Sequence, residues 1–158
     1  MDGFAYAGEA LTGKYFGANN KIGFAKVYRS LFAWGAIMAL TFTLVYALGG
    51  HHFLLLLTNE CDVVAAAQDY FWWAVFIPIV GVSAFIYDGI FIGLTETKGM
   101  LVSSVISAIA FFLFFISLKQ LLGNHALWLA FLVYLALRGF IQWILYRKVI
   151  PWSRISSK

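Results

Sequence analysis

Four ionisable residues lie within otherwise apolar stretches of this sequence: Asp2, Glu9, Asp88 and Arg138. A charge inside an apolar helix is costly, and it usually faces a protein interior or a water-filled cavity, so each is a candidate for chemistry. At 1.5 Å of rise per residue, Asp88 lies ~9 Å, Glu9 ~12 Å and Arg138 ~13 Å from the end of its stretch. Their similar depth predicts that these three side chains face one another, or face one cavity.

Two interpretations of this charged layer follow from the residue types. Asp88 or Glu9 paired with Arg138 would hold helices together, because buried charges usually pair. In the other interpretation, the carboxylates exchange a cation or a proton in a water-filled cavity. Both can hold, because a pair that breaks on ion binding acts as a switch.

Other polar residues share helical faces with these charges. Tyr134, Arg138 and Gln142 repeat every four residues, which predicts one polar stripe along a helix. Tyr6 lies on the face that the first two acids share. The candidates for substrate or ion binding are therefore Asp2, Tyr6, Glu9, Asp88, Tyr134, Arg138 and Gln142.

Pro78 lies inside an apolar stretch, ten residues before Asp88. A proline there removes one backbone hydrogen bond and presses against the carbonyl group of Ala74, so we expect a kink. A kinked helix beside an acidic residue is typical of a transporter site. Ser103, Ser104 and Ser107 are interpreted as contacts for close packing between helices.

Catalytic and metal chemistry find little support in the residue pattern. The sequence has no Ser/His/Asp set, no glycine loop for phosphate and no HExxH motif, so we expect neither an enzyme nor a cofactor. His51 and His52 stand near Cys61, but their spacing does not match a zinc site. The carboxylates are instead expected to exchange a cation or a proton.

The composition places the chain in a membrane. Of its 158 residues, 63% are apolar and 11% are charged, and the mean hydropathy is +0.86. A soluble domain of this size could not cover so much apolar surface. The net charge of +4 does not indicate nucleic-acid binding, because the basic residues form no stripe interleaved with aromatic residues.

Four apolar stretches are long enough to cross a bilayer, which takes about 20 residues per helix. The segment before them is too short for a full span and is interpreted as the inner part of a helix, so the chain would begin in mid-helix. Short connections predict antiparallel neighbours in an all-α bundle, and 49–69 is expected to be a short interfacial connection. The expected helices are 1–18 (partial), 24–48, 70–94, 100–122 and 126–146.

Lysine and arginine collect at one side of the predicted bundle. By the positive-inside rule this side is cytoplasmic, which places the protein in the plasma (inner) membrane as a multi-pass protein with a cytoplasmic C-terminus. Lys119 is the only lysine or arginine expected at the opposite side. The basic side carries Lys14, Lys21, Lys26, Arg29, Lys98, Arg147, Lys148, Arg154 and Lys158.

One internal similarity suggests a repeated hairpin. The end of the first segment reads YFGANNKIGFAKV, and the end of the 70–94 stretch reads FIGLTETKGMLVS. Each has a glycine, a polar turn with a lysine and then a new helix. Repeated units of this kind are common in transporters.

Three segments resemble parts of the multidrug and toxic compound extrusion (MATE) family, and the pattern of the first segment fits its DinF-like branch best. The family's eighth helix is similar to DGFAYAGEALTGKYFGANN, and its outer segment is similar to LLLLTNECDVVAAAQDYFWW. Its tenth helix is similar to FIPIVGVSAFIYDGIFIGLTETKGM, with Asp88 at the acidic position. The resemblance covers essentially the whole chain.

The resemblance implies a fold of twelve helices in two six-helix lobes. This chain would hold the end of helix eight through helix twelve, and the N-terminal lobe would be its partner across the cavity. The family exports organic cations and amphipathic compounds, driven by sodium or proton entry. In part of the family the coupling acid lies in the first lobe. The alternative is a small membrane interaction protein that assembles with a partner and transports nothing itself.

Overall fold

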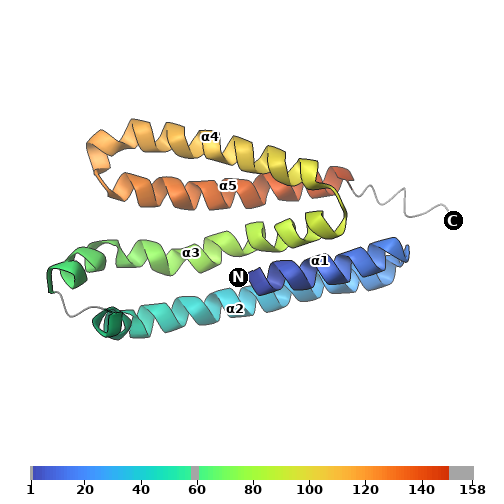
Figure 1. Cartoon of the computed structure of the whole chain (residues 1–158), viewed down its shortest axis with the longest axis horizontal. Coiled ribbons are helices and arrows are strands. Elements are labelled where there is room, and N and C mark those ends of the chain that lie inside the picture. Colours follow the sequence, from blue (N-terminus) through green and yellow to red (C-terminus); the bar gives the residue numbers. More distant parts are fainter. Residues whose placement is uncertain (1, 58–60, 150–158) are drawn as a thin grey trace.

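A computed structural model describes residues 2–57 and 61–149 of the chain, and each element in these ranges is an α-helix. The all-α fold expected from the composition is confirmed (Figure 1). The helices are α1 (Asp2–Gly17), α2 (Lys21–Leu57), α3 (Cys61–Gly93), α4 (Thr97–Leu122) and α5 (His125–Val149).

Four of these helices are long and apolar enough to cross a membrane, which makes the chain an integral membrane protein. On α2, α4 and α5 the apolar side chains are largely exposed on the outer faces, where lipid is the natural solvent; Leu113 on α4, for example, is 62% exposed. The spanning segments are Lys21–Gly50, Asp62–Gly93, Thr97–Leu122 and His125–Val149.

The connection expected at 49–69 is largely helical. The spanning part of α2 ends at Gly50, and Figure 1 shows the final turns of this helix viewed end-on, so they turn away from its main axis. Two adjacent glycines are a common cause of such a bend. α3 already begins at Cys61. The carboxylate of Asp62 lies in its first turn, where a negative charge interacts favourably with the helix dipole. The turn expected at Thr58 and Asn59 falls outside the described residues.

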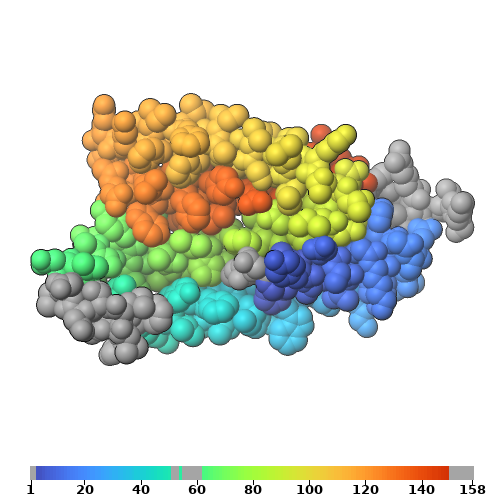
Figure 2. All heavy atoms as spheres, viewed as in Figure 1, coloured from blue at the N-terminus to red at the C-terminus, as the bar shows by residue number. Residues whose placement is uncertain are grey.

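The bundle is built around α3. α1, α3 and α5 run in one direction, and α2 and α4 run in the other (Figure 1). α3 packs against α1, α2 and α5, whereas α4 packs mainly against α5. Figure 2 shows the α4–α5 hairpin along one edge of the molecule and the α1 and α2 pair along the other. The core between α2, α3 and α5 contains Phe24, Leu31, Ile86, Tyr87, Ile90, Phe91 and Tyr146.

The turns after α1 and after α3 have the same geometry. Asn19 and Thr95 hold the same place in these turns, and their φ angles are 52° and 59°. In each turn this residue's amide donates to the carbonyl three residues back, and the next amide donates to the carbonyl five residues back, all at 2.9–3.0 Å. This pair of bonds is the Schellman motif. The hairpin repeat expected from the sequence thus has a structural counterpart in the α1–α2 and α3–α4 turns.

α1 and α3 approach closely because two glycines of α3 carry no side chain. A Cβ atom on Gly89 would collide with the backbone of Ala5, and one on Gly93 would meet the Thr12 side chain and the Glu9 carbonyl oxygen. Small residues at such crossings let membrane helices make extensive van der Waals contact. This crossing determines which face of α1 is turned toward α3.

Most of the described basic residues gather at one end of the bundle. α1, α3 and α5 end there, and α2 and α4 begin there (Figure 1). The opposite end carries Asp62, Asp69 and Lys119. The described basic residues at or near the first end are Lys14, Lys21, Lys26, Arg29, Lys98, Arg147 and Lys148.

Candidate functional site

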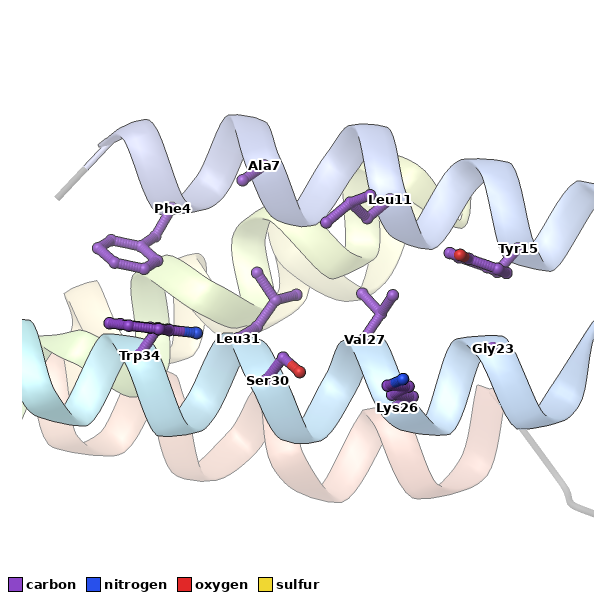
Figure 3. Close-up of a pocket in the computed structure, with 10 residues that line it drawn as sticks. All are labelled: Phe4, Ala7, Leu11, Tyr15, Gly23, Lys26, Val27, Ser30, Leu31 and Trp34. Atoms are coloured by element: carbon purple, nitrogen blue, oxygen red, sulfur yellow. The ribbon is translucent and has the colours of Figure 1, made fainter.

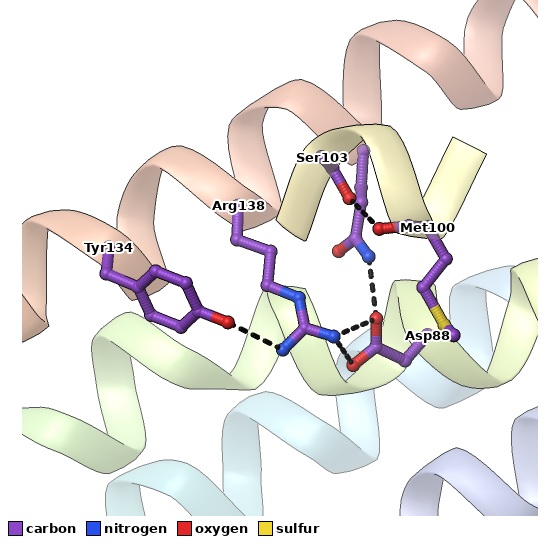
Figure 4. A network of polar contacts seen from close by, with 6 residues as sticks. Asp88, Met100, Ser103, Tyr134 and Arg138 are labelled. Atoms are coloured by element: carbon purple, nitrogen blue, oxygen red, sulfur yellow. Dashed lines mark hydrogen bonds and ion pairs between the residues drawn. The ribbon is translucent and has the colours of Figure 1, made fainter. Parts of the chain in front are cut away.

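A polar network joins α3 to α5 within their spanning segments. Nη2 of Arg138 lies 2.9 Å from Oδ2 of Asp88 and donates to Oδ1 at 3.0 Å. Nε2 of Gln142 donates to the same Oδ1 at 2.6 Å. Nη1 of Arg138 points to the hydroxyl of Tyr134 at 3.5 Å, a long contact (Figure 4). The Asp88 carboxylate therefore has three polar contacts, all from α5.

Local periodicity on α5 and a close helix contact create this network. Residues four apart on a helix share a face, so Tyr134, Arg138 and Gln142 project together, as the sequence predicted. At Gly139, α5 lies so near α3 that an added Cβ would collide with the Ser83 side chain. The absence of a side chain there brings the stripe within reach of α3.

The network is shielded from solvent, which strengthens its electrostatics. The side chains of Arg138 and Asp88 are 19% and 14% exposed, and Gln142 is fully buried. Charges in such a site attract more strongly and are less screened by salt than charges on a surface. One nitrogen of Arg138 contacts both carboxylate oxygens, in place of the two-nitrogen fork of the strongest arginine–carboxylate pairs. The Arg138 guanidinium is thus held to the carboxylate through one nitrogen.

Three buried polar atoms have no hydrogen-bond partner in the described part of the chain, and two of them belong to this network. They are Nε of Arg138, Oε1 of Gln142 and Oγ of Ser107. A buried polar atom without a partner costs about 1–3 kcal/mol, so such atoms need an explanation. Carboxylate, amide and hydroxyl oxygens are the ligands that hard cations prefer. The Oε1 atom of Gln142 therefore has unused capacity for a small cation or for water, whereas the Nε–H group of Arg138 is a donor that an acceptor such as water would satisfy.

The structure gathers four of the seven candidates from the sequence in this network, and the other three belong to α1. Of the two acids proposed as partners for Arg138, it is Asp88 that forms the ion pair. Glu9 is half-buried on α1, and within the described residues no hydrogen bond or ion pair joins its carboxylate to the network. Tyr6 is 71% exposed. The side chain of Asp2 falls outside the described residues.

Pro78 is buried in α3, and the helix continues through it from Cys61 to Gly93. Three residues earlier, the carbonyl of Val75 accepts a hydrogen bond from the hydroxyl of Thr43 on α2, at 3.1 Å. Neighbouring threonines commonly satisfy backbone groups near a proline in membrane helices. The kink itself remains a prediction.

Sequence reasoning missed a cluster of three tyrosines next to the network. The hydroxyls of Tyr28 and Tyr87 lie 2.8 Å apart, and the rings of Tyr28 and Tyr146 stack with their centroids at 5.1 Å. Tyr87 is adjacent to Asp88 in the chain, and the three tyrosines belong to or pack against the core between α2, α3 and α5. The three residues come from α2, α3 and α5, so no spacing along the chain could have linked them.

A separate cavity of about 460 Å³ lies between α1 and α2 (Figure 3). Its lining is mainly apolar, with Phe4 and Trp34 toward one end and Tyr15 toward the other. Lys26 and Ser30 are among its few polar residues. No residue of the Asp88 network lines it, so the charged site and this apolar cavity are distinct features.

Comparison with known proteins shows to which family the chain belongs. The MatE family model matches residues 1–118, which include Asp88 and the helices α1 to α4 almost completely. DNA damage-inducible protein F of Escherichia coli (strain K12) is 41% identical over 148 residues, which is 94% of this chain. The chain spans 32% of the length of that relative. No solved structure gives a significant match. Since the family model covers most of the sequence, the chain belongs to the MATE family of membrane transporters, in its DinF-like branch.

Proposed function

We propose that this chain is the C-terminal part of a secondary active efflux transporter, which exports organic cations or amphipathic compounds in exchange for sodium or protons. Membership of the MATE family and four membrane-spanning helices support the proposal. Because the chain spans 32% of its relative's length, a second lobe would supply the other wall of the substrate cavity. Alternating access in such transporters moves one helix bundle against another.

The observation that carries the proposal is the Asp88–Arg138 pair inside the spanning segments. When ionised, Asp88 holds both Arg138 and Gln142. A proton or a sodium ion on the carboxylate would cancel the charge that attracts the guanidinium. The packing of α5 against α3, which is close where Ser83 meets Gly139, would then lose its ion pair. Ion entry would thereby change the packing of two helices.

A purely structural pair is the competing explanation. Replacing a buried ion pair by apolar residues is often neutral for stability, so pairing alone gives little reason to keep two charges in lipid. Arg138 contacts the carboxylate through one nitrogen only, and polar atoms of Arg138 and Gln142 lack partners. Both observations favour ion exchange over a permanent structural ion pair. The experiment must therefore separate coupling from folding.

Substitution of Asp88 provides that test. In membrane vesicles that contain the complete transporter with both lobes, Asp88→Asn is expected to abolish substrate movement driven by a proton or sodium gradient, because the neutral amide cannot exchange the ion. The double variant Asp88→Asn/Arg138→Gln removes the unpaired arginine that would otherwise destabilise the helices by about 3–5 kcal/mol. It should reach the membrane normally and still fail to couple. Glu96→Gln, which removes an exposed acid outside the network, is the matched control.

The two gradients, imposed separately, identify the coupling ion. Movement driven only by a pH gradient would indicate protons, and movement driven only by a sodium gradient would indicate sodium. Gradient-driven export by the double variant at the wild-type rate would show that the pair is structural. If neither gradient moves a substrate even in the wild-type protein, the alternative of a membrane assembly protein is favoured.

A further inference from the structure

A second polar site lies at the basic end, on the outer side of the tyrosine cluster. A cavity of about 290 Å³ opens there between α2 and α5, away from the Asp88 network. Two arginines, one from each helix, line it together with aromatic rings and one alanine. Its lining residues are Ala25, Tyr28, Arg29, Trp143, Tyr146 and Arg147.

Both guanidinium groups are available to a ligand. Arg29 and Arg147 are exposed, and neither forms an ion pair with a carboxylate in residues 2–57 and 61–149. The Glu96 carboxylate at the same end is paired with neither of them. Two uncompensated positive charges in one cavity attract an anion and also repel each other. An anion between them would relieve that repulsion.

The geometry of Arg147 favours a phosphate group. Its guanidinium carbon lies 3.9 Å from the centre of the Trp143 ring, a cation–π arrangement that fixes the plane of the group. A guanidinium held in this way keeps its N–H edges free for two parallel hydrogen bonds to a phosphate. The stacked rings of Tyr28 and Tyr146 form part of the wall beside it.

The location indicates the source of that phosphate. The cavity lies where the apolar spans of α2 and α5 meet the basic end of the bundle, which is the level of lipid headgroups. Basic pockets between helices at this level suit anionic headgroups, and tryptophan and tyrosine rings prefer the same depth. A phospholipid would place its phosphate between the arginines and its acyl chains along the exposed apolar helix faces.

We propose that Arg29, Arg147 and Trp143 form a binding site for the phosphate group of an anionic phospholipid. A lipid bound at this site would link the basic ends of α2 and α5 on the outer surface, as the stacked rings of Tyr28 and Tyr146 link them in the interior. This inference goes beyond the transport proposal and does not depend on it, since neither arginine touches the Asp88 network.

Native mass spectrometry of the protein from nanodiscs tests the site. The nanodiscs contain equal amounts of phosphatidylglycerol and phosphatidylcholine, and the measurement counts retained lipids of each kind. The wild-type protein should retain more phosphatidylglycerol than phosphatidylcholine. Arg29→Gln/Arg147→Gln should lose that preference, by roughly fivefold for each arginine removed. The control variant Lys14→Gln/Lys98→Gln removes the same charge at the same end but outside the cavity, and it should keep the preference.

Three results would overturn the proposal. Equal loss in both double variants would show that only the general positive field matters, and absence of any preference in the wild-type protein would show that there is no site. Inorganic phosphate or glycerol phosphate in the buffer should leave the lipid count unchanged; displacement at low concentration would assign the cavity to a soluble phosphate. The single variant Arg29→Gln, compared with Lys98→Gln, repeats the comparison with a smaller perturbation, and helicity by circular dichroism verifies folding.

Discussion

The backbone of Ala5 on α1 lies directly against Gly89 on α3, with no room for a side chain between them. Gly89→Ala should therefore force the two helices apart. Overpacking of this kind costs about 1–3 kcal/mol, more than alanine gains in helix propensity. The thermal unfolding midpoint in detergent should fall. Gly17→Ala is the matched control, because nothing lies within 4 Å of its added Cβ. Equal effects of the two substitutions would contradict a tight crossing.

The turn between α3 and α4 holds a threonine in an unfavourable conformation. Thr95 has a φ of 59°, and a β-branched residue rarely adopts this left-handed region. Thr95→Gly should stabilise the protein by about 1 kcal/mol, because strained residues of this kind cost about that much or more. Asn19→Gly in the equivalent turn should gain less, since asparagine tolerates the conformation. Unfolding midpoints of both variants check the ranking, and a larger gain at Asn19 would refute it.

Two hydroxyl groups of the tyrosine cluster, those of Tyr28 and Tyr87, should show energetic coupling in stability measurements. The hydroxyls of Tyr28 and Tyr87 lie 2.8 Å apart, and Tyr87 is 2% exposed. Tyr28→Phe and Tyr87→Phe should each cost about 1 kcal/mol, because each leaves one hydroxyl without its partner. The double variant should cost little more than either single one. Strictly additive losses would mean that the two hydroxyls do not interact in the membrane.

The charge distribution predicts which end of the bundle faces the cytoplasm. Cys61 is the only cysteine, and it begins α3 at the end opposite the basic residues. A membrane-impermeant maleimide should label it in intact cells. The variant Cys61→Ser/Thr97→Cys moves the thiol to the start of α4 at the basic end, where labelling should require opened cells. The reverse pattern would place the basic end outside.

The sequence alone was enough to determine the class of the protein and much of its helical layout. Lipid is the solvent that tolerates 63% apolar residues, and helix length follows from bilayer thickness. The stripe of Tyr134, Arg138 and Gln142 was also predictable, because residues four apart share a face on any helix. The similarity of the two segments YFGANNKIGFAKV and FIGLTETKGMLVS predicted a repeated hairpin, and both of its turns are Schellman motifs. All of these features depend on composition or on neighbours along the chain.

The tertiary structure alone decided which groups meet. Glu9 and Asp88 were equal partners for Arg138 by depth, and depth says nothing about the rotation of a helix about its axis. That rotation is determined by where glycines let backbones touch: Gly89 directs α1 onto α3, and Gly139 brings α5 to Asp88. The tyrosine cluster and the arginine-lined cavity likewise join α2 to α5, which are far apart in the chain. Contacts of this kind depend on packing in three dimensions, so no spacing in the sequence could reveal them.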